Sequence, residues 1–192
     1  MTTNILLCGV GGQGTLLASN ILAETALKSG NDVKKSEVHG MAQRGGSVVS
    51  HVKFGREVFS PLIRKGECDI LLSFERLEAL RWSEFLRPTG TIIMNDQKIL
   101  PMSVSAGDAK YPDDIPGMLK KSFAKVLTFD ALSKAKELGN AKCVNVVLLG
   151  ILARNLPMFS VDNWLEVIAE RIPPKILEIN KKAFHCGWEM AN

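Results

Sequence analysis

The sequence lacks any apolar run of the roughly 18 residues that a membrane-spanning helix requires. Its longest apolar stretch, residues 144–156, is interrupted by Asn145, Arg154 and Asn155. No basic leader or small-residue cleavage site precedes the first apolar segment, so a secretory signal is not expected. We therefore predict a cytoplasmic protein with no membrane partner.

Closely spaced cysteines are also missing. The four cysteines, Cys8, Cys68, Cys143 and Cys186, form no C-x-x-C pair. Iron–sulfur clusters and structural zinc usually take ligands that are close in sequence, so we expect this chain to bind neither. Free, mostly buried thiols in a reducing compartment are the simplest interpretation.

The chain has no internal repeat, low-complexity tract or linker, and no recurring basic–aromatic pattern typical of nucleic-acid binding. Its 192 residues, 46% hydrophobic and 23% charged, are typical of one soluble globular domain. We predict a single domain over residues 1–192 and no nucleic-acid partner.

Positive charge is concentrated in one stretch. Residues 31–65 hold seven cations and three carboxylates, an excess of +4 that equals the net charge of the chain. An anionic ligand or an acidic partner surface could use this stretch, and a solvated face is the alternative. The cations are Lys34, Lys35, Arg44, Lys53, Arg56, Arg64 and Lys65.

A glycine-rich loop follows the apolar run at residues 5–7. Gly9, Gly11 and Gly14 match the G-x-G-x-x-G spacing, with Gly12 and Gln13 between them. Glycine lets the backbone turn tightly and lets a ligand or a second chain come close. Amides at a helix N-terminus attract anions. The loop therefore predicts a strand–loop–helix unit and a candidate anion site, although tight structural turns often share this spacing.

Alternating apolar strands and amphipathic helices predict an α/β fold with a modified doubly wound, largely parallel sheet, an inserted β-hairpin and C-terminal helices. The hairpin is expected from strands 47–54 and 57–63, and residues 101–117 are expected to be irregular. Loops 9–14 and 39–46 follow the first two strands, so they should lie side by side. The other expected strands are 5–8, 32–38, 69–73, 91–95 and 125–129, and the expected helices are 15–29, 75–86, 131–138, 144–156, 161–171 and one from Pro174.

An NAD site is one interpretation of the glycine loop. That fingerprint requires an acidic residue about 20 positions later, and Glu37 lies near this place. Against it, Lys34 and Lys35 precede Glu37, a glycine-rich loop replaces the second helix, and a hairpin replaces the third β-α unit.

The segment from Glu37 to Ser47 forms a second motif. Its paired glycines, Gly45 and Gly46, follow Arg44, so backbone amides and a guanidinium can converge on one anion or carbonyl group. A structural loop is the alternative interpretation. The other candidate residues of this motif are His39, Gly40, Gln43 and Ser47.

Together the two motifs, in this order and at this distance, resemble the gamma-type subunits of 2-oxoacid:ferredoxin oxidoreductases. The amino-acid sequence from His39 to Gly46 is most similar to that of the small subunits of indolepyruvate ferredoxin oxidoreductases. The resemblance covers the whole chain in length and element order, and its specific motifs lie within residues 5–54.

The resemblance implies that a large partner subunit carries thiamine diphosphate, magnesium and iron–sulfur clusters and passes electrons to ferredoxin. It also implies a 2-oxoacid that is decarboxylated to an acyl-coenzyme A, with no cofactor bound by this chain alone. The sequence agrees in lacking a thiamine signature, because Gly107-Asp108 is followed by neither a third glycine nor an Asn-Asn pair.

We hypothesise that the two loops hold the phosphates of coenzyme A, the shared substrate, with Arg44 as an anion contact and His39 and Gln43 as polar contacts. The competing hypothesis is that both loops only dock the partner. A stand-alone NAD-dependent enzyme and a nucleotide-sensing module remain as alternatives from other classes. His51 and His185 are expected to be structural.

Overall fold

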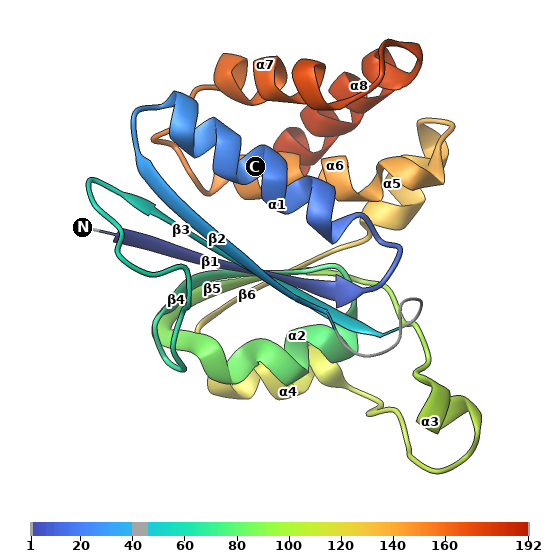
Figure 1. The fold of residues 1–192 in the computed structure, drawn as a ribbon. Helices are drawn as coiled ribbons and strands as arrows, with labels where there is room; N and C mark the ends of the chain where they lie inside the picture. Colours follow the sequence, from blue (N-terminus) through green and yellow to red (C-terminus); the bar gives the residue numbers. More distant parts are fainter. Residues whose placement is uncertain (1, 40–45, 192) are drawn as a thin grey trace.

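The computed structural model describes residues 2–39 and 46–191 and places six strands in one mixed sheet (Figure 1). The strands are β1 (Thr2–Val10), β2 (Asp32–His39), β3 (Ser47–Gly55), β4 (Cys68–Ser73), β5 (Leu86–Asn95) and β6 (Lys125–Phe129). Their order is β2-β3-β1-β4-β5-β6. Strand β3 runs antiparallel to both of its neighbours, β1 and β2, whereas β1, β4, β5 and β6 pair in parallel. This confirms the predicted α/β fold with a largely parallel sheet.

Helices cover both faces of the sheet. In Figure 1, α1, α5, α6, α7 and α8 lie on one face and α2 and α4 on the other, each set over its own hydrophobic core. The helices are α1 (Thr15–Lys28), α2 (Arg76–Trp82), α3 (Met102–Ser105), α4 (Ile115–Ser122), α5 (Ala131–Glu137), α6 (Val144–Arg154), α7 (Val161–Arg171) and α8 (Pro174–Met190), with 3-10 turns η1 (Ser83–Phe85) and η2 (Ala141–Cys143).

The chain changes face between β1 and β4. The helix after β1, α1, covers one face of the sheet, and the helix after β4, α2, covers the other (Figure 1). In doubly wound sheets, ligands bind beyond the carboxyl ends of the strands at such a switch point. The carboxyl ends of β1 and β4 are therefore the first place to look for a site.

Helix α6 is buried along almost its whole length, as its apolar sequence predicts. It packs closely against α8, where a Cβ on Gly150 would meet the Phe184 carbonyl oxygen and a Cβ on Gly187 would meet the Val147 carbonyl oxygen. Glycine at both positions lets the two helix backbones touch. The packing of α6 also fixes its N-terminus near the glycine loop.

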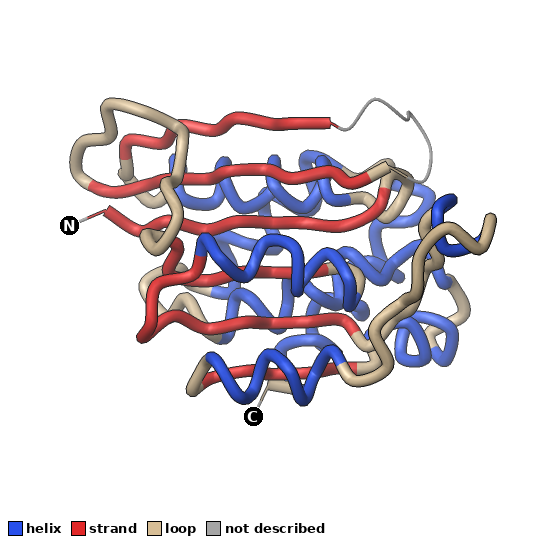
Figure 2. The backbone as a smooth tube through the Cα atoms, turned by 90° about the horizontal axis from the view of Figure 1, so that it is seen from below, coloured by secondary structure: helices blue, strands red, loops and turns tan. Residues whose placement is uncertain are grey.

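The predicted hairpin is wrong in its second strand. Residues 57–63 form no strand; β3 pairs instead with β2 on one edge and β1 on the other, so no edge is left for another strand (Figure 2). Side chains satisfy backbone amides of the loop, because Val58 N donates to Asp32 Oδ2 (2.8 Å) and Ile63 N donates to His51 Nδ1 (3.1 Å). Pro61 lacks an amide donor for a sheet ladder. The hairpin is therefore made of β2 and β3.

Helices also occur where an irregular segment was expected. Residues 101–117 contain α3 and the first turn of α4. Asp114 caps α4 by accepting a hydrogen bond from Gly117 N (2.9 Å), and a proline stands in its first turn, where proline favours helix initiation. The remaining predicted strands and helices are confirmed, with shifts at their ends. No helix among the described residues is long and apolar enough to cross a membrane.

Candidate functional site

The glycine loop joins β1 to α1 and takes the tight conformation that its sequence predicts. Gly12 and Gly14 have φ values of 102° and 81°, the left-handed region that favours glycine. Gly14 is the N-cap of α1 and has no side-chain cap; the first helical hydrogen bond runs from Ala18 N to Gly14 O (3.1 Å). The amides of the first turn of α1 are consequently not used by the helix itself.

Gln13 closes the crevice at the switch point. Its Oε1 accepts a hydrogen bond from Val10 N (2.7 Å), and its Nε2 donates to Phe74 O (2.9 Å) and Gln97 Oε1 (3.1 Å). Gly9 makes room for this arrangement, since a Cβ there would lie 2.9 Å from Gln13 Oε1. The Gln13 amide thus ties the ends of β1 and β4 to the segment after β5, and its hydrogen-bonding capacity is largely spent within the chain.

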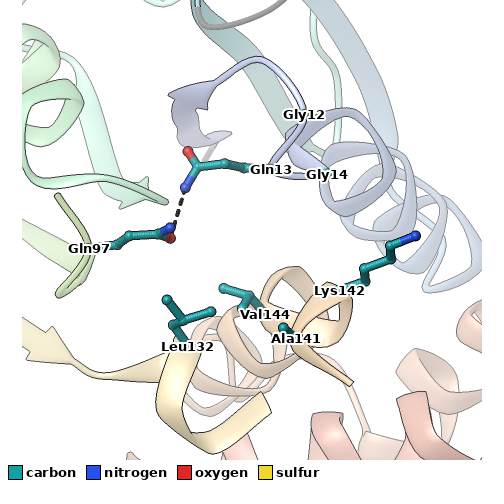
Figure 3. A pocket seen from close by; sticks show the side chains of 8 residues that line it. All are labelled: Gly12, Gln13, Gly14, Gln97, Leu132, Ala141, Lys142 and Val144. Carbon is teal, nitrogen blue, oxygen red and sulfur yellow. Dashed lines mark hydrogen bonds between the residues drawn. The ribbon is translucent and has the colours of Figure 1, made fainter. Parts of the chain in front are cut away.

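A cavity of about 510 Å³ opens beside the Gln13 side chain, on the side of α1, α5 and α6 (Figure 3). We call it the glycine-loop pocket. In Figure 3 the Gln13 and Gln97 side chains meet on one side of it and Lys142 stands on the other. Backbone amides at the start of α1 and a lysine at the rim favour an anionic ligand. The lining residues are Gly12, Gln13, Gly14, Gln97, Leu132, Ala141, Lys142 and Val144.

Asn145 supports the loop from beneath. It is buried, and its Nδ2 donates to Gly14 O over 3.4 Å. A Cβ on Gly14 would lie 2.6 Å from the same Nδ2. Gly14 therefore must be glycine both for its positive φ and for the space that Asn145 occupies.

The second motif meets the first at one end. Gly11 N donates to Gly46 O over 2.9 Å, so the expected proximity of the two loops is confirmed there. His39 ends β2 and pairs with Val48 of β3 through the backbone. Gly40, Gln43, Arg44 and Gly45 lie outside the described residues, and their assignment to the site stays a prediction.

Ser47 faces α2, on the opposite side of the sheet from the glycine-loop pocket. Its Oγ hydrogen-bonds to Glu78 Oε2 and accepts from Trp82 Nε1 (3.4 Å). Glu78 is only 2% exposed, and this burial raises the pKa of its carboxyl group, against the opposing effects of Ser47 and Arg81. Ser47 is therefore an anchor for the end of the motif and does not line the pocket.

The NAD interpretation fails on geometry. The end of β2 lies next to β3, not next to β1, so Glu37 is one strand further from the glycine loop than the fingerprint requires. Glu37 Oε1 also accepts hydrogen bonds from Lys35 Nζ (2.6 Å) and Ser19 Oγ (3.4 Å). The Glu37 carboxylate is thus already hydrogen-bonded to Lys35 and Ser19 rather than free to bind a ribose.

Three cations of residues 31–65 form ion pairs with carboxylates. Lys34 pairs with Asp32 (2.5 Å), and Lys35 pairs with Glu37 (2.6 Å). Lys65 pairs with Glu84 (2.8 Å) from outside the stretch. Asp32 and Glu37 are already counted in the excess of +4, so of the ion pairs that the described residues form in this stretch, only the one with Glu84 lowers that excess, by one charge.

The four cysteines form no disulfide bond. Cys8, Cys68 and Cys143 are buried and Cys186 is half-buried, and all four are free thiols. Burial raises the pKa of Cys68 to about 12. No group of three or more His, Cys, Asp or Glu side chains in residues 2–39 and 46–191 is arranged to hold a metal ion. His51 has the structural role expected of it, since its Nδ1 accepts the Ile63 amide.

Sequence reasoning missed the distant half of the pocket. Gln97 comes two residues after β5, and Lys142 comes just before α6. Both positions carry a usable signal, because residues that follow strands or precede helices collect at this edge of a doubly wound sheet. Without the fold, nothing in the sequence associates them with the glycines.

Comparison with known proteins gives a consistent result. Residues 4–190 match the family model described as pyruvate ferredoxin/flavodoxin oxidoreductase. The chain is 44% identical to indolepyruvate oxidoreductase subunit IorB of Pyrococcus horikoshii, over 98% of this chain and 95% of the relative. It is 42% identical to the IorB subunit of Thermococcus kodakarensis, over the same shares of the two chains.

A solved structure shares the fold. The gamma subunit of a keto/oxoacid ferredoxin oxidoreductase from Geobacter sulfurreducens superposes with a TM-score of 0.74 and 26% identity, over 98% of both chains. The β3 insertion and the helices on both faces therefore belong to a known arrangement.

Proposed function

Because the chain belongs to the pyruvate ferredoxin/flavodoxin oxidoreductase family, we propose that it is the small subunit of an indolepyruvate:ferredoxin oxidoreductase complex acting on aryl pyruvates. The observation that carries this proposal is the match to the IorB subunits over nearly the full length of both chains. The complex oxidatively decarboxylates the 2-oxoacid and transfers the acyl group to coenzyme A, with ferredoxin as electron acceptor.

The cofactors of this reaction belong to a large partner subunit. Thiamine diphosphate with magnesium supplies the decarboxylation chemistry, and iron–sulfur clusters supply the electron path. Within residues 2–39 and 46–191 the thiols are dispersed and no carboxylates gather into a metal-binding cluster, so these residues offer no ligand set for an iron–sulfur cluster or a magnesium ion. The isolated chain should accordingly be inactive.

What this chain contributes is a binding surface for coenzyme A at the partner's active site. The first-turn amides of α1 and the Lys142 ammonium group can neutralise phosphate oxygens in the glycine-loop pocket. Arg44 would add an anion contact, and His39 and Gln43 polar contacts, from the second motif. Glu78 positions the end of that motif through Ser47.

Co-expression with a large subunit that carries thiamine and ferredoxin-like cysteine motifs tests the proposal. We expect the two chains to copurify and to reduce ferredoxin with indolepyruvate only when coenzyme A is present. NAD reduction by the purified chain alone would overturn the proposal. Tight nucleotide binding by the chain without any partner activity would favour a sensor instead.

The role of the second motif has its own test. If Arg44 contacts coenzyme A, Arg44→Ala should raise the concentration of coenzyme A needed for half-maximal rate by about tenfold, with normal assembly. If the loops only dock the partner, the same substitution should weaken copurification. Lys120→Ala, on α4, is a control that removes an exposed cation from the other face of the sheet.

A further inference from the structure

The chain between β5 and α4 forms an arm at the carboxyl edge of the sheet. It carries the short helix α3, which stands apart from both helical layers in Figure 1. We call residues 99–110 the α3 arm. Val104 of the arm packs against the hydrophobic core that α2 and α4 cover, whereas Leu100 and Met102 are exposed. The arm therefore turns one apolar side chain inward and presents two to its surroundings.

One buried carboxylate fixes both ends of the α3 arm. Glu75 is only 1% exposed, and its Oε1 accepts hydrogen bonds from Ile99 N (3.1 Å) and from the Tyr111 hydroxyl group (2.6 Å). Within the arm, Asp108 N donates to Ser103 O over 2.8 Å, which closes the segment on itself. Compact loops whose ends lie close together are frequently functional. A surface that is fixed before binding also loses less conformational entropy when a partner covers it.

The surface of the α3 arm is apolar and uncharged. Met102 is 83% exposed and Leu100 is 49% exposed. No charged residue occurs from Ile99 to Gly107, although 23% of the chain is charged. Charged residues are depleted and methionine is enriched at the centre of protein–protein interfaces. The arm accordingly suits an apolar protein surface better than an anionic ligand or an acidic protein.

The position of the α3 arm indicates which protein covers it. In the proposed function, the large partner subunit brings its active site to the glycine loop. Gln97 lies at this edge, and the arm begins two residues later. The carbonyl oxygen of Gln97 accepts a hydrogen bond from Arg76 N (3.0 Å), and its side chain contacts Gln13. A chain that covers this edge of the sheet from the glycine loop toward α2 would therefore also meet the arm.

We propose that Leu100 and Met102 of the α3 arm dock into an uncharged apolar groove of the large partner subunit. This assignment rests on the proposed function, and it concerns the contact between subunits rather than the binding of a substrate. The arm holds the carboxyl edge of the sheet against the partner, because its base is fixed to α2 through Glu75 and to the glycine loop through Gln97. Apolar interfaces with few charges are typical of permanent complexes.

Dilution of the co-expressed complex, followed by native mass spectrometry, tests the proposal. Met102→Ser should raise the dissociation constant of the two chains about 30-fold, the effect of losing one interface hot spot. Leu100→Ser should act in the same direction, and the double variant should no longer copurify. The yield of soluble small subunit should stay unchanged, because both side chains are exposed. Met118→Ser, on α4 and outside the arm, is the matched control, since Met118 is 44% exposed and its loss should leave the dissociation constant unchanged.

Met102→Asp gives a second, stronger variant. A carboxylate without a partner is unfavourable in an apolar groove, so this substitution should abolish copurification. Unchanged dissociation constants for Met102→Ser and Met102→Asp would overturn the docking assignment. Weaker self-association of the small subunit, with the complex intact, would also overturn it, because a second copy would then be the occupant. A wild-type complex that assembles but fails to oxidise indolepyruvate would refute the proposed function instead.

Discussion

Replacing Gly14 by alanine should damage the glycine loop far more than replacing Gly12. Both residues have positive φ, 81° and 102°. A Cβ on Gly12 meets nothing within 4 Å, whereas a Cβ on Gly14 lies 2.6 Å from Asn145 Nδ2. The pair therefore separates the cost of backbone strain from the cost of a steric clash within one loop.

The magnitudes follow from these two contributions. A left-handed conformation costs a non-glycine residue about 1–2 kcal/mol, and the reduced entropy of the unfolded chain returns about 0.4–1 kcal/mol. Gly12→Ala should thus lower the free energy of unfolding by roughly 1 kcal/mol. Gly14→Ala adds overpacking against a buried, hydrogen-bonded amide, about 1–3 kcal/mol more. For a chain of this length, a total of about 3 kcal/mol lowers the melting temperature by about 6–12 °C.

Urea unfolding of a double-mutant cycle measures the clash directly. In an Asn145→Ala background the extra cost of Gly14→Ala over Gly12→Ala should fall to within about 0.5 kcal/mol of zero, because the clashing amide is gone. In the complex, Gly14→Ala should also raise the KM for coenzyme A, since it displaces the first turn of α1. Equal costs for the two alanine variants in the wild-type background would refute the reasoning.

Two further predictions concern packing and pH. Gly187→Ala should destabilise the chain by about 3 kcal/mol or more in thermal unfolding, because its Cβ would strike the Val147 carbonyl oxygen of α6; a small loss would show that the two helices can separate without cost. Burial raises the pKa of Glu78 above its ordinary value of 4.5, so the native state holds this proton more tightly than the unfolded chain does. That contribution is complete below about pH 4.5 and is lost as the pH rises through the raised pKa. Glu78→Gln should therefore lose less stability than the wild type over this window in urea unfolding, and parallel pH profiles would contradict the assignment.

Local sequence patterns predict most of the fold because apolar periodicity and turn residues depend mainly on neighbouring residues in the chain. The apolar runs of β1, β4, β5 and β6 and the glycine after β1 indicate parallel strands and a strand–helix turn whatever surrounds them. The failure at residues 57–63 has a tertiary cause. An apolar segment next to β3 looks like its hairpin partner, but β3 already has β1 and β2 on its two edges.

The candidate site likewise has one part that local sequence predicts and one part that depends on the tertiary fold. The sequence placed the glycine loop at the carboxyl edge of the sheet and brought the second motif to it, and the contact between Gly11 and Gly46 bears this out. It did not reveal that the Gln13 amide would bond to Phe74 and Gln97, because those bonds depend on which strands are neighbours. Nor did it associate Lys142 with the loop across the fold.

The insertion of β3 between β1 and β2 accounts for how this fold departs from a dinucleotide-binding one. It moves the end of β2 one strand away from the glycine loop, so an acidic residue there cannot reach a ribose bound at that loop. The same strand begins at Ser47, beside Gly46, and so leads the second motif back to Gly11. One added antiparallel strand thus removes the determinant of NAD binding and brings a second loop to the glycines. With Gln13 filling the crevice, the space left for a ligand lies toward α1, α5 and α6, where the glycine-loop pocket is found.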